Sequence, residues 1–130
     1  MTKQVTAHQK FIRQTPQKLR LIADLVRKLD IEEAITQLKI SSKKGSKQVL
    51  KVLNQAKSNA INAGFKTETI KIHSIEIQEG PTYKRWQPVS RGRAHSIFKR
   101  NSHIKIILEG SSQPTNKPES KPVTKGKKGK

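Results

Sequence analysis

The sequence predicts an α+β fold in which three helices pack on a small antiparallel sheet, with a long protruding β-hairpin. Apolar residues recur at helical spacing between residues 16 and 63, and at alternate positions from residue 69 onward. The segment 80–102 shows neither period, although it is too long for a simple turn. Because one strand, three helices and two strands follow in that order, we expect the two late strands to pair in one hairpin.

The charge of the chain points to a polyanionic partner. Among the 130 residues, 28 are Lys or Arg and 9 are Asp or Glu, which gives a formal net charge of +19. Self-repulsion at this charge disfavours a compact isolated domain, so phosphates would supply counter-charge as well as a binding target. No apolar run approaches the roughly 18 residues of a membrane-spanning helix, and the lack of cysteine excludes disulfides and thiolate metal sites. Nucleic acid is therefore the expected partner, with no membrane association.

The N-terminal part is expected to contain an extended segment followed by a helix. Residues 3–12 alternate loosely between apolar and polar side chains and indicate an edge strand. Thr15 can cap a helix whose first position is taken by Pro16, where the missing N–H costs nothing. The apolar face of this helix is expected to consist of Leu19, Ile22, Leu25, Val26 and Leu29.

Two further helices are expected before the late strands. Asp30 and Glu33 have the spacing of a capping box at the start of the second helix. The third helix is expected to begin at Ser41 or Ser42 and to end before Gly64, which suits the left-handed position after a helix end. Its apolar face is expected to consist of Val49, Leu53, Ala56, Ala60 and Ala63. The late alanines would let another backbone approach closely.

Two strands are predicted after the helices. The first extends from Thr69 to Ile77, and a parity slip at His73-Ser74 indicates a β-bulge. The second extends from Ser102 to Glu109, with alternate apolar residues on one face. Both strands are therefore expected to pack on the helices.

The composition changes near residue 110. Beyond it the chain consists mostly of Gly, Ser, Pro, Thr and Lys, a mixture that cannot bury enough apolar surface to order itself. The sequence therefore predicts one domain at residues 1–110, which includes the extended hairpin at 80–102, and a disordered basic tail at 111–130.

The hairpin segment has the composition expected for binding irregular RNA. Between residues 80 and 108 there is no acid, and the cations are Lys84, Arg85, Arg91, Arg93, Lys99, Arg100 and Lys105. The flat side chains interleaved with them are Tyr83, Trp86, His95 and Phe98. Cations can neutralise backbone phosphates while flat side chains stack on unpaired bases. Proline and glycine in the segment favour a stiff ribbon with a tight tip, and the alternative is a mobile basic loop.

Two motifs resemble a known family. Glu79 to Ile104, EGPTYKRWQPVSRGRAHSIFKRNSHI, closely resembles the signature of the bacterial-type large-subunit ribosomal protein twenty-two family. Thr15 to Arg27, TPQKLRLIADLVR, is similar to the first helix of that family. The resemblance covers about residues 4–109 without large gaps, and the hairpin motif is the more specific of the two.

The resemblance implies a structural constituent of the large ribosomal subunit that binds large-subunit ribosomal RNA and assists its assembly. It also implies that the extended hairpin lines the nascent-peptide exit tunnel, beside the tip of the large-subunit protein numbered four. The partners would be the RNA, neighbouring large-subunit ribosomal proteins and the nascent peptide, with no homo-oligomer and no cofactor. The location would be the ribosome, in the cytoplasm of a bacterium or inside an organelle with its own ribosomes.

The candidate site residues divide into two groups. Those expected to contact RNA are Arg13, Lys18, Arg20, Lys84, Arg85, Arg91, Arg93, Lys99, Arg100 and His103. Those expected at the tunnel hairpin tip are Tyr83, Trp86, Gln87, Pro88, Val89, Ser90 and Gly92. The chain departs from the family at Val89 and Gln17, where the family usually has arginine, so two expected cations are absent.

Two other classes of function, an enzyme and a DNA-binding dimer, agree less well with the sequence. An enzyme would need its histidines and acids in a catalytic arrangement, but they show no metal-ligand spacing, and the sequence has no nucleophile motif or phosphate-binding glycine loop. We therefore expect no catalytic residue and no metal. An architectural DNA-binding dimer with basic β-arms is the stronger rival. It would need a helical dimer interface, whereas the apolar residues suffice only for the core of one monomer.

Overall fold

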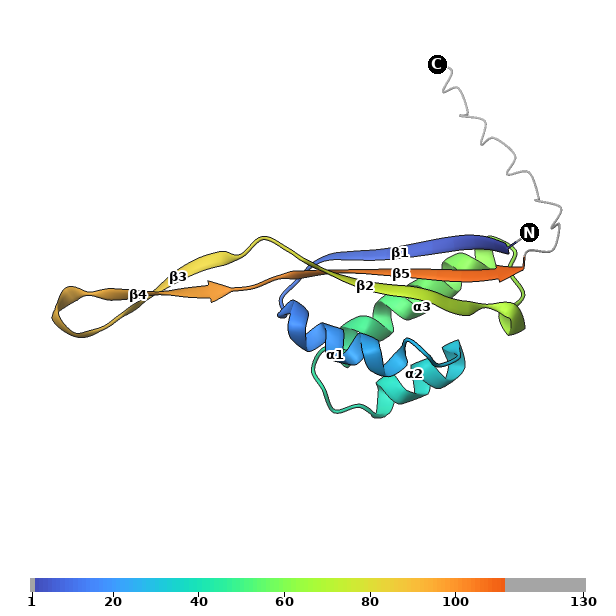
Figure 1. Cartoon of the computed structure of the whole chain (residues 1–130), viewed down its shortest axis with the longest axis horizontal. Coiled ribbons are helices and arrows are strands. Elements are labelled where there is room, and N and C mark those ends of the chain that lie inside the picture. Colours follow the sequence, from blue (N-terminus) through green and yellow to red (C-terminus); the bar gives the residue numbers. More distant parts are fainter. Residues whose placement is uncertain (1, 112–130) are drawn as a thin grey trace, which may run out of the picture.

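The computed structural model describes residues 2–111, so all but the first residue of the predicted tail lies outside the described residues. A three-stranded sheet carries helices on one face, and a narrow two-stranded ribbon extends from one end of it (Figure 1). The α-helices and strands are β1 (Thr2–Ile12), α1 (Pro16–Val26), α2 (Ile31–Ile40), α3 (Ser46–Asn62), β2 (Lys71–Glu79), β3 (Tyr83–Pro88), β4 (Ala94–Lys99) and β5 (Ser102–Ser111). The predicted α+β class and the three helices are confirmed.

The larger sheet has the strand order β1-β5-β2, and both pairings are antiparallel. The predicted pairing of the two late strands is therefore confirmed. The register of β2 shifts between Ile72 and Ser74, which confirms the predicted bulge. A second shift, between Gln9 and Ile12 of β1, was not predicted.

The core lies between the sheet and α3. Alternate residues of β5 are buried, and Ile104, Ile106 and Leu108 are at most 1% exposed. They belong to one apolar cluster with Leu53 and Ala56 of α3, a helix that packs on β1 and β5. The small side chains of Ala56 and Ala60 permit this close approach of helix and sheet, as the sequence predicts. Ala63, which was predicted on the same face, is exposed and follows the end of the helix.

The beginnings of α1 and α2 agree with prediction in position but not in capping chemistry. Pro16 occupies the first turn of α1, and the carbonyl of Thr15 accepts a hydrogen bond from the Leu19 N–H at 3.3 Å. Neither Thr15 nor Asp30 makes a side-chain capping bond, so the predicted capping box does not form. Leu25 is also not in the core: it is 46% exposed because it lies at the edge of the apolar face of α1.

The prediction that the third helix begins at Ser41 or Ser42 is wrong, because α3 starts at Ser46. The chain must reverse between α2 and α3, and the loop does this by burying Gly45, where a Cβ would lie 2.7 Å from Ile22 Cδ1. The end of α3 is as predicted. Gly64 has a φ of 83°, and its N–H bonds the carbonyl of Ile61 at 2.9 Å.

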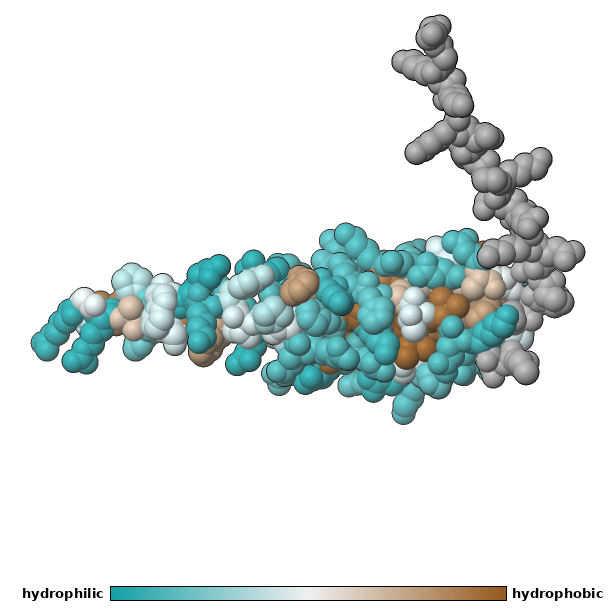
Figure 2. Space-filling view, turned by 90° about the horizontal axis from the view of Figure 1, so that it is seen from above, coloured by the Kyte–Doolittle hydropathy of each residue, from teal (hydrophilic) through white to brown (hydrophobic). Residues whose placement is uncertain are grey.

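β3 and β4 form a separate two-stranded sheet, the ribbon of the hairpin. Its pairing begins with Tyr83 opposite Lys99 and ends with Pro88 opposite Ala94. Its turn contains two consecutive residues with positive φ, Arg91 at 59° and Gly92 at 71°. Every side chain of β3 is exposed. Hydrophilic residues cover most of the length of this ribbon, whereas apolar residues gather on the body (Figure 2).

Candidate nucleic-acid interface

The root of the hairpin is fixed to the body by hydrogen bonds. The Gly80 N–H donates to the carbonyl of Asn101 at 2.9 Å, and Asn101 Nδ2 donates to the carbonyl of Pro81 at 3.1 Å. Asn101 is 1% exposed, so this bridge is shielded from water. The two strands therefore leave the body from a defined position, which sets the direction of the hairpin.

An open groove of about 780 Å³ lies beside this root. It is bordered by the start of α1, the loop before α3 and the end of β4. Its cationic residues are Arg13, Lys18, Lys43, Lys44, Lys99 and Arg100. None of the residues that line it is acidic. Such a groove attracts a polyanion, because its low-dielectric walls and like charges concentrate a positive potential.

The groove also offers flat and apolar surface. Phe98, which is 51% exposed, and Leu21, which is 59% exposed, both line it. The guanidinium of Arg100 lies 6.0 Å from the centre of the Phe98 ring. Cations beside exposed apolar surface fit a strand of RNA, whose phosphates need counter-charge and whose unpaired bases need a surface to stack on.

A second cluster of cations and an aromatic ring lies at the first pair of the hairpin. The guanidinium of Arg13 is 5.6 Å from the centre of the Tyr83 ring, and that of Arg85 is 5.7 Å from it. These distances are in the range of cation–π attraction. Arg13 therefore links the groove to the base of the hairpin.

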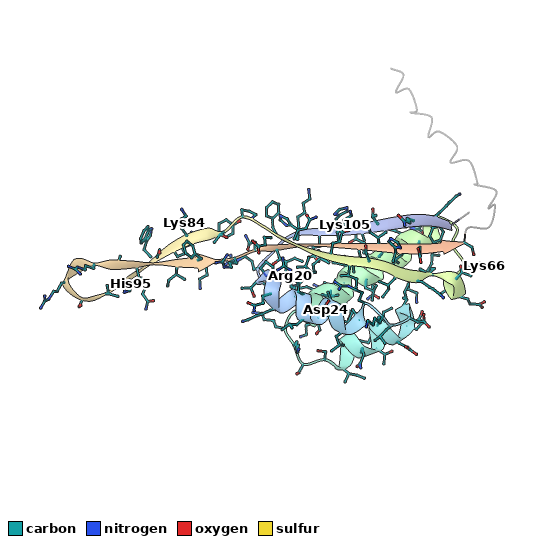
Figure 3. The ribbon with its side chains drawn as sticks, viewed as in Figure 1. Arg20, Asp24, Lys66, Lys84, His95 and Lys105 are labelled. Atoms are coloured by element: carbon teal, nitrogen blue, oxygen red, sulfur yellow. The ribbon has the colours of Figure 1, made fainter. Side chains whose placement is uncertain are left out.

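The structure brings together some of the sequence-predicted RNA contacts and separates others. Arg13, Lys18, Lys99 and Arg100 line the groove. Arg20 is not among the lining residues, and its Nη2 lies 3.9 Å from Glu79 Oε1. The remaining cations of that prediction lie along the hairpin: Lys84, Arg85, Arg91 and Arg93. Lys84, from β3, and His95, from β4, extend from the ribbon far from the helices (Figure 3).

His103 has structural contacts of its own. Its Nδ1 accepts a hydrogen bond from the Phe11 N–H at 3.0 Å, and its ring packs edge-on against the Phe11 ring with centroids 5.0 Å apart. The residue is partly buried beside Gly80. These contacts account for its position without an RNA ligand.

The turn of the hairpin is narrower than the predicted tip. The turn lies at residues 89–93, where the Val89 N–H bonds the carbonyl of Arg93 at 2.8 Å. Val89, Ser90 and Gly92 thus lie in the turn, together with Arg91 and Arg93. The other predicted tip residues lie on β3: Trp86, Gln87 and Pro88 in its outer half, and Tyr83 at its first pair, at the root.

Lys43 and Lys44 were not among the predicted site residues, although both line the groove. They lie in the loop between α2 and α3. The third helix was expected to begin at Ser41 or Ser42, so both lysines were predicted to be helical. The signal was available in the run Lys43-Lys44-Gly45. Glycine is common in turns, so this run could have indicated a loop that carries two cations.

The described residues form neither a metal site nor a membrane-spanning helix. Within residues 2–111, no group of three or more His, Cys, Asp or Glu side chains could hold a metal ion. Of the helices in the part of the chain that the structure describes, none has the length and apolar character needed to cross a membrane.

Comparison with known proteins identifies relatives. Residues 7–109 match the family described as Ribosomal protein L22p/L17e. Large ribosomal subunit protein uL22 of Syntrophobacter fumaroxidans is 44% identical over 106 residues, which cover 81% of this chain and 96% of the relative. The protein of the same name from Mycoplasma mobile is 46% identical over 93 residues, 71% of this chain and 84% of the relative. The protein of this name from Metamycoplasma hominis is 47% identical over 95 residues, which cover 72% of this chain and 74% of the relative.

Proposed function

We propose that the basic groove and hairpin root of this chain, which belongs to the ribosomal protein L22p/L17e family, bind large-subunit ribosomal RNA. Membership makes the chain a structural constituent of the large ribosomal subunit, in a family that is not enzymatic. It also disfavours the rival architectural DNA-binding function. RNA and other ribosomal proteins are the partners that a ribosomal protein implies.

The groove is the main observation that supports RNA binding. Its six cations come from three separate parts of the chain, and the fold brings them to one concave surface without an acid among them. Their mutual repulsion would cost stability if no anion offset it. Phosphates of a folded RNA supply that counter-charge, and release of the condensed counterions then drives binding. Binding would in this way hold RNA segments together and assist assembly of the subunit.

The hairpin supports a second part of the proposal, that β3 and β4 line the nascent-peptide exit tunnel. The ribbon forms its own sheet and exposes every β3 side chain, so its surface is free to contact a surrounding wall on both faces. Its cations would bind RNA, while Trp86 and the turn would face the passing peptide. Residues 1–110 would then act as one RNA-binding unit located on the ribosome of a bacterium or an organelle.

The groove proposal is tested by the salt dependence of binding to a transcript of the large-subunit RNA. If about six phosphates are neutralised, log K should fall against log salt with a slope on the order of −5. The double variant Lys43→Gln with Lys44→Gln should make this slope shallower by about two, since each lysine accounts for about one unit.

The matched control is Lys66→Gln with Lys71→Gln. Lys66 precedes β2, and Lys71 is the first residue of that strand. Lys66 lies at the end of the body opposite the hairpin (Figure 3). The control changes the net charge by the same amount but should leave the slope nearly as it is. Equal losses in the two double variants would mean that net charge alone drives binding, and the groove would have no special role.

A further inference from the structure

Phe11 combines two features that are unfavourable for a free protein. Its φ of 57° lies in the left-handed region, where a residue with a bulky side chain is a rare outlier. Its side chain is also 57% exposed, although it is one of the larger apolar groups of the chain. Glycine at this position would remove both costs.

The local structure explains how this conformation is held. Gln9 pairs with Ile104 and Ile12 with Ser102, so the two residues between them on β1 face only His103 on β5. This is the geometry of a β-bulge. The Phe11 N–H is directed to His103 Nδ1, and the two rings meet at an interplanar angle of 83°.

His103 is itself held in place. A Cβ on Gly80 would lie 3.0 Å from His103 Cε1 and 3.2 Å from Nε2, so the imidazole packs closely against the backbone at the root of the hairpin. The bulge, the imidazole and the hairpin root therefore fix the orientation of the Phe11 ring. A backbone outlier that its surroundings maintain in this way points to a use for the side chain.

The charges nearby indicate what the ring would contact. Phe11 lies between the exposed cations Lys10 and Arg13, and the latter also lines the groove and stands over Tyr83. A nucleotide would place its base on a ring and its phosphate near these cations. An apolar side chain from another protein would leave the cations without counter-charge, so the surroundings favour RNA.

We propose that Phe11 is a nucleobase-stacking residue, which binds one unpaired base of the RNA at the point where the hairpin leaves the body. The inference rests on the proposed function, because it assigns a further contact to the same RNA-binding surface. It also explains the bulge in β1, which turns the Phe11 ring outward where regular pairing would continue the strand.

The test uses the full chain and a transcript of the large-subunit RNA. Phe11→Gly should lower affinity by roughly 5- to 150-fold, the range for loss of one base–aromatic stack. The midpoint of thermal unfolding should rise or stay the same, because glycine accepts the positive φ. The slope of log K against log salt should not change, because stacking releases no counterions.

Two further variants separate stacking from apolar contact. Phe11→Tyr keeps an aromatic ring and should bind within about threefold of wild type, since every aromatic face can stack on a base. Phe11→Leu keeps apolar surface but has no ring, and it should lose nearly as much affinity as Phe11→Gly. Wild-type affinity in Phe11→Leu would show that the side chain meets an apolar surface, and the stacking proposal would be overturned.

The remaining outcomes distinguish this inference from the function on which it rests. If the wild-type chain did not bind the transcript, the proposed function itself would fail. If the wild type bound and Phe11→Gly bound equally well, only the stacking role would be refuted. A clear fall in the unfolding midpoint of Phe11→Gly would also overturn the inference, because Phe11 would then support the fold.

Discussion

β4 and β5 are neighbouring stretches of one extended chain, yet their surroundings differ completely. Only Arg100 and Asn101 separate them. β5 buries alternate side chains against the helices and pairs with a strand on each side, whereas β4 exposes every side chain except Ile97, which is partly buried. The same backbone conformation is thus stabilised by a core in the body and by a single hydrogen-bonded partner in the hairpin.

This difference shows how the molecule divides its tasks. Burial of apolar surface makes the body a self-sufficient scaffold. A two-stranded hairpin without a core is at most marginally stable in water. The hairpin should therefore depend on contacts outside the chain for its fixed conformation. Its exposed cations and rings are suited to such contacts, and they need not contribute to folding.

The largest expected loss of stability comes from a core residue under β5. Leu53 of α3 is fully buried, and Leu53→Ala should lower the free energy of unfolding by about 2–5 kcal/mol, because transfer energy is lost and a cavity remains. Urea denaturation followed by circular dichroism measures this. The control Leu21→Ala removes a leucine that is 59% exposed and should change stability by less than about 0.5 kcal/mol. Similar losses in both variants would contradict the described core.

A smaller effect is expected at the border between the two regions. Asn101→Ala removes the bond from Nδ2 to the Pro81 carbonyl, while the buried Oδ1, which has no partner, disappears as well. We expect a loss of about 1 kcal/mol in urea denaturation. Backbone amides of the hairpin should also exchange faster with solvent. Asn54→Ala, on the exposed side of α3, is the matched control, and its stability should change by less than about 0.5 kcal/mol.

The sequence predicts the body well because its patterns follow from burial. The alternation of apolar and polar residues predicted β5, and apolar residues at helical spacing predicted the three helices. The change of parity at His73-Ser74 predicted the bulge in β2. Errors arose where tertiary packing overrides local preference. Ser41 and Ser42 look like helix caps, but they lie in the loop before α3, whose Gly45 packs against Ile22.

The candidate site was harder to predict than the fold. A groove forms where segments that are distant in the sequence meet in the fold. The sequence alone therefore could not show that Lys43 and Lys44 lie near Lys99. The bulge at Phe11 was missed for a related reason. Its cause is the single residue opposite it, His103, on a strand far along the chain. In β2 the shift leaves a clear parity slip in the sequence, whereas the loose alternation of β1 does not show where its shift falls.

The smallest change in stability is expected from removing most of the hairpin. Replacing residues 85–97 by Asn-Gly keeps the pairs Tyr83 with Lys99 and Lys84 with Phe98, and Asn-Gly favours a two-residue turn. Urea denaturation should give a free energy of unfolding within about 0.5 kcal/mol of wild type, because no removed residue belongs to the core cluster. On the proposed function, large subunits that carry this variant should still assemble. Their response to macrolides should change, which the resemblance to the family implies for changes at the hairpin tip. Loss of the cooperative unfolding transition would show that the hairpin is part of the folding unit, and the contrast between the two regions would then be wrong.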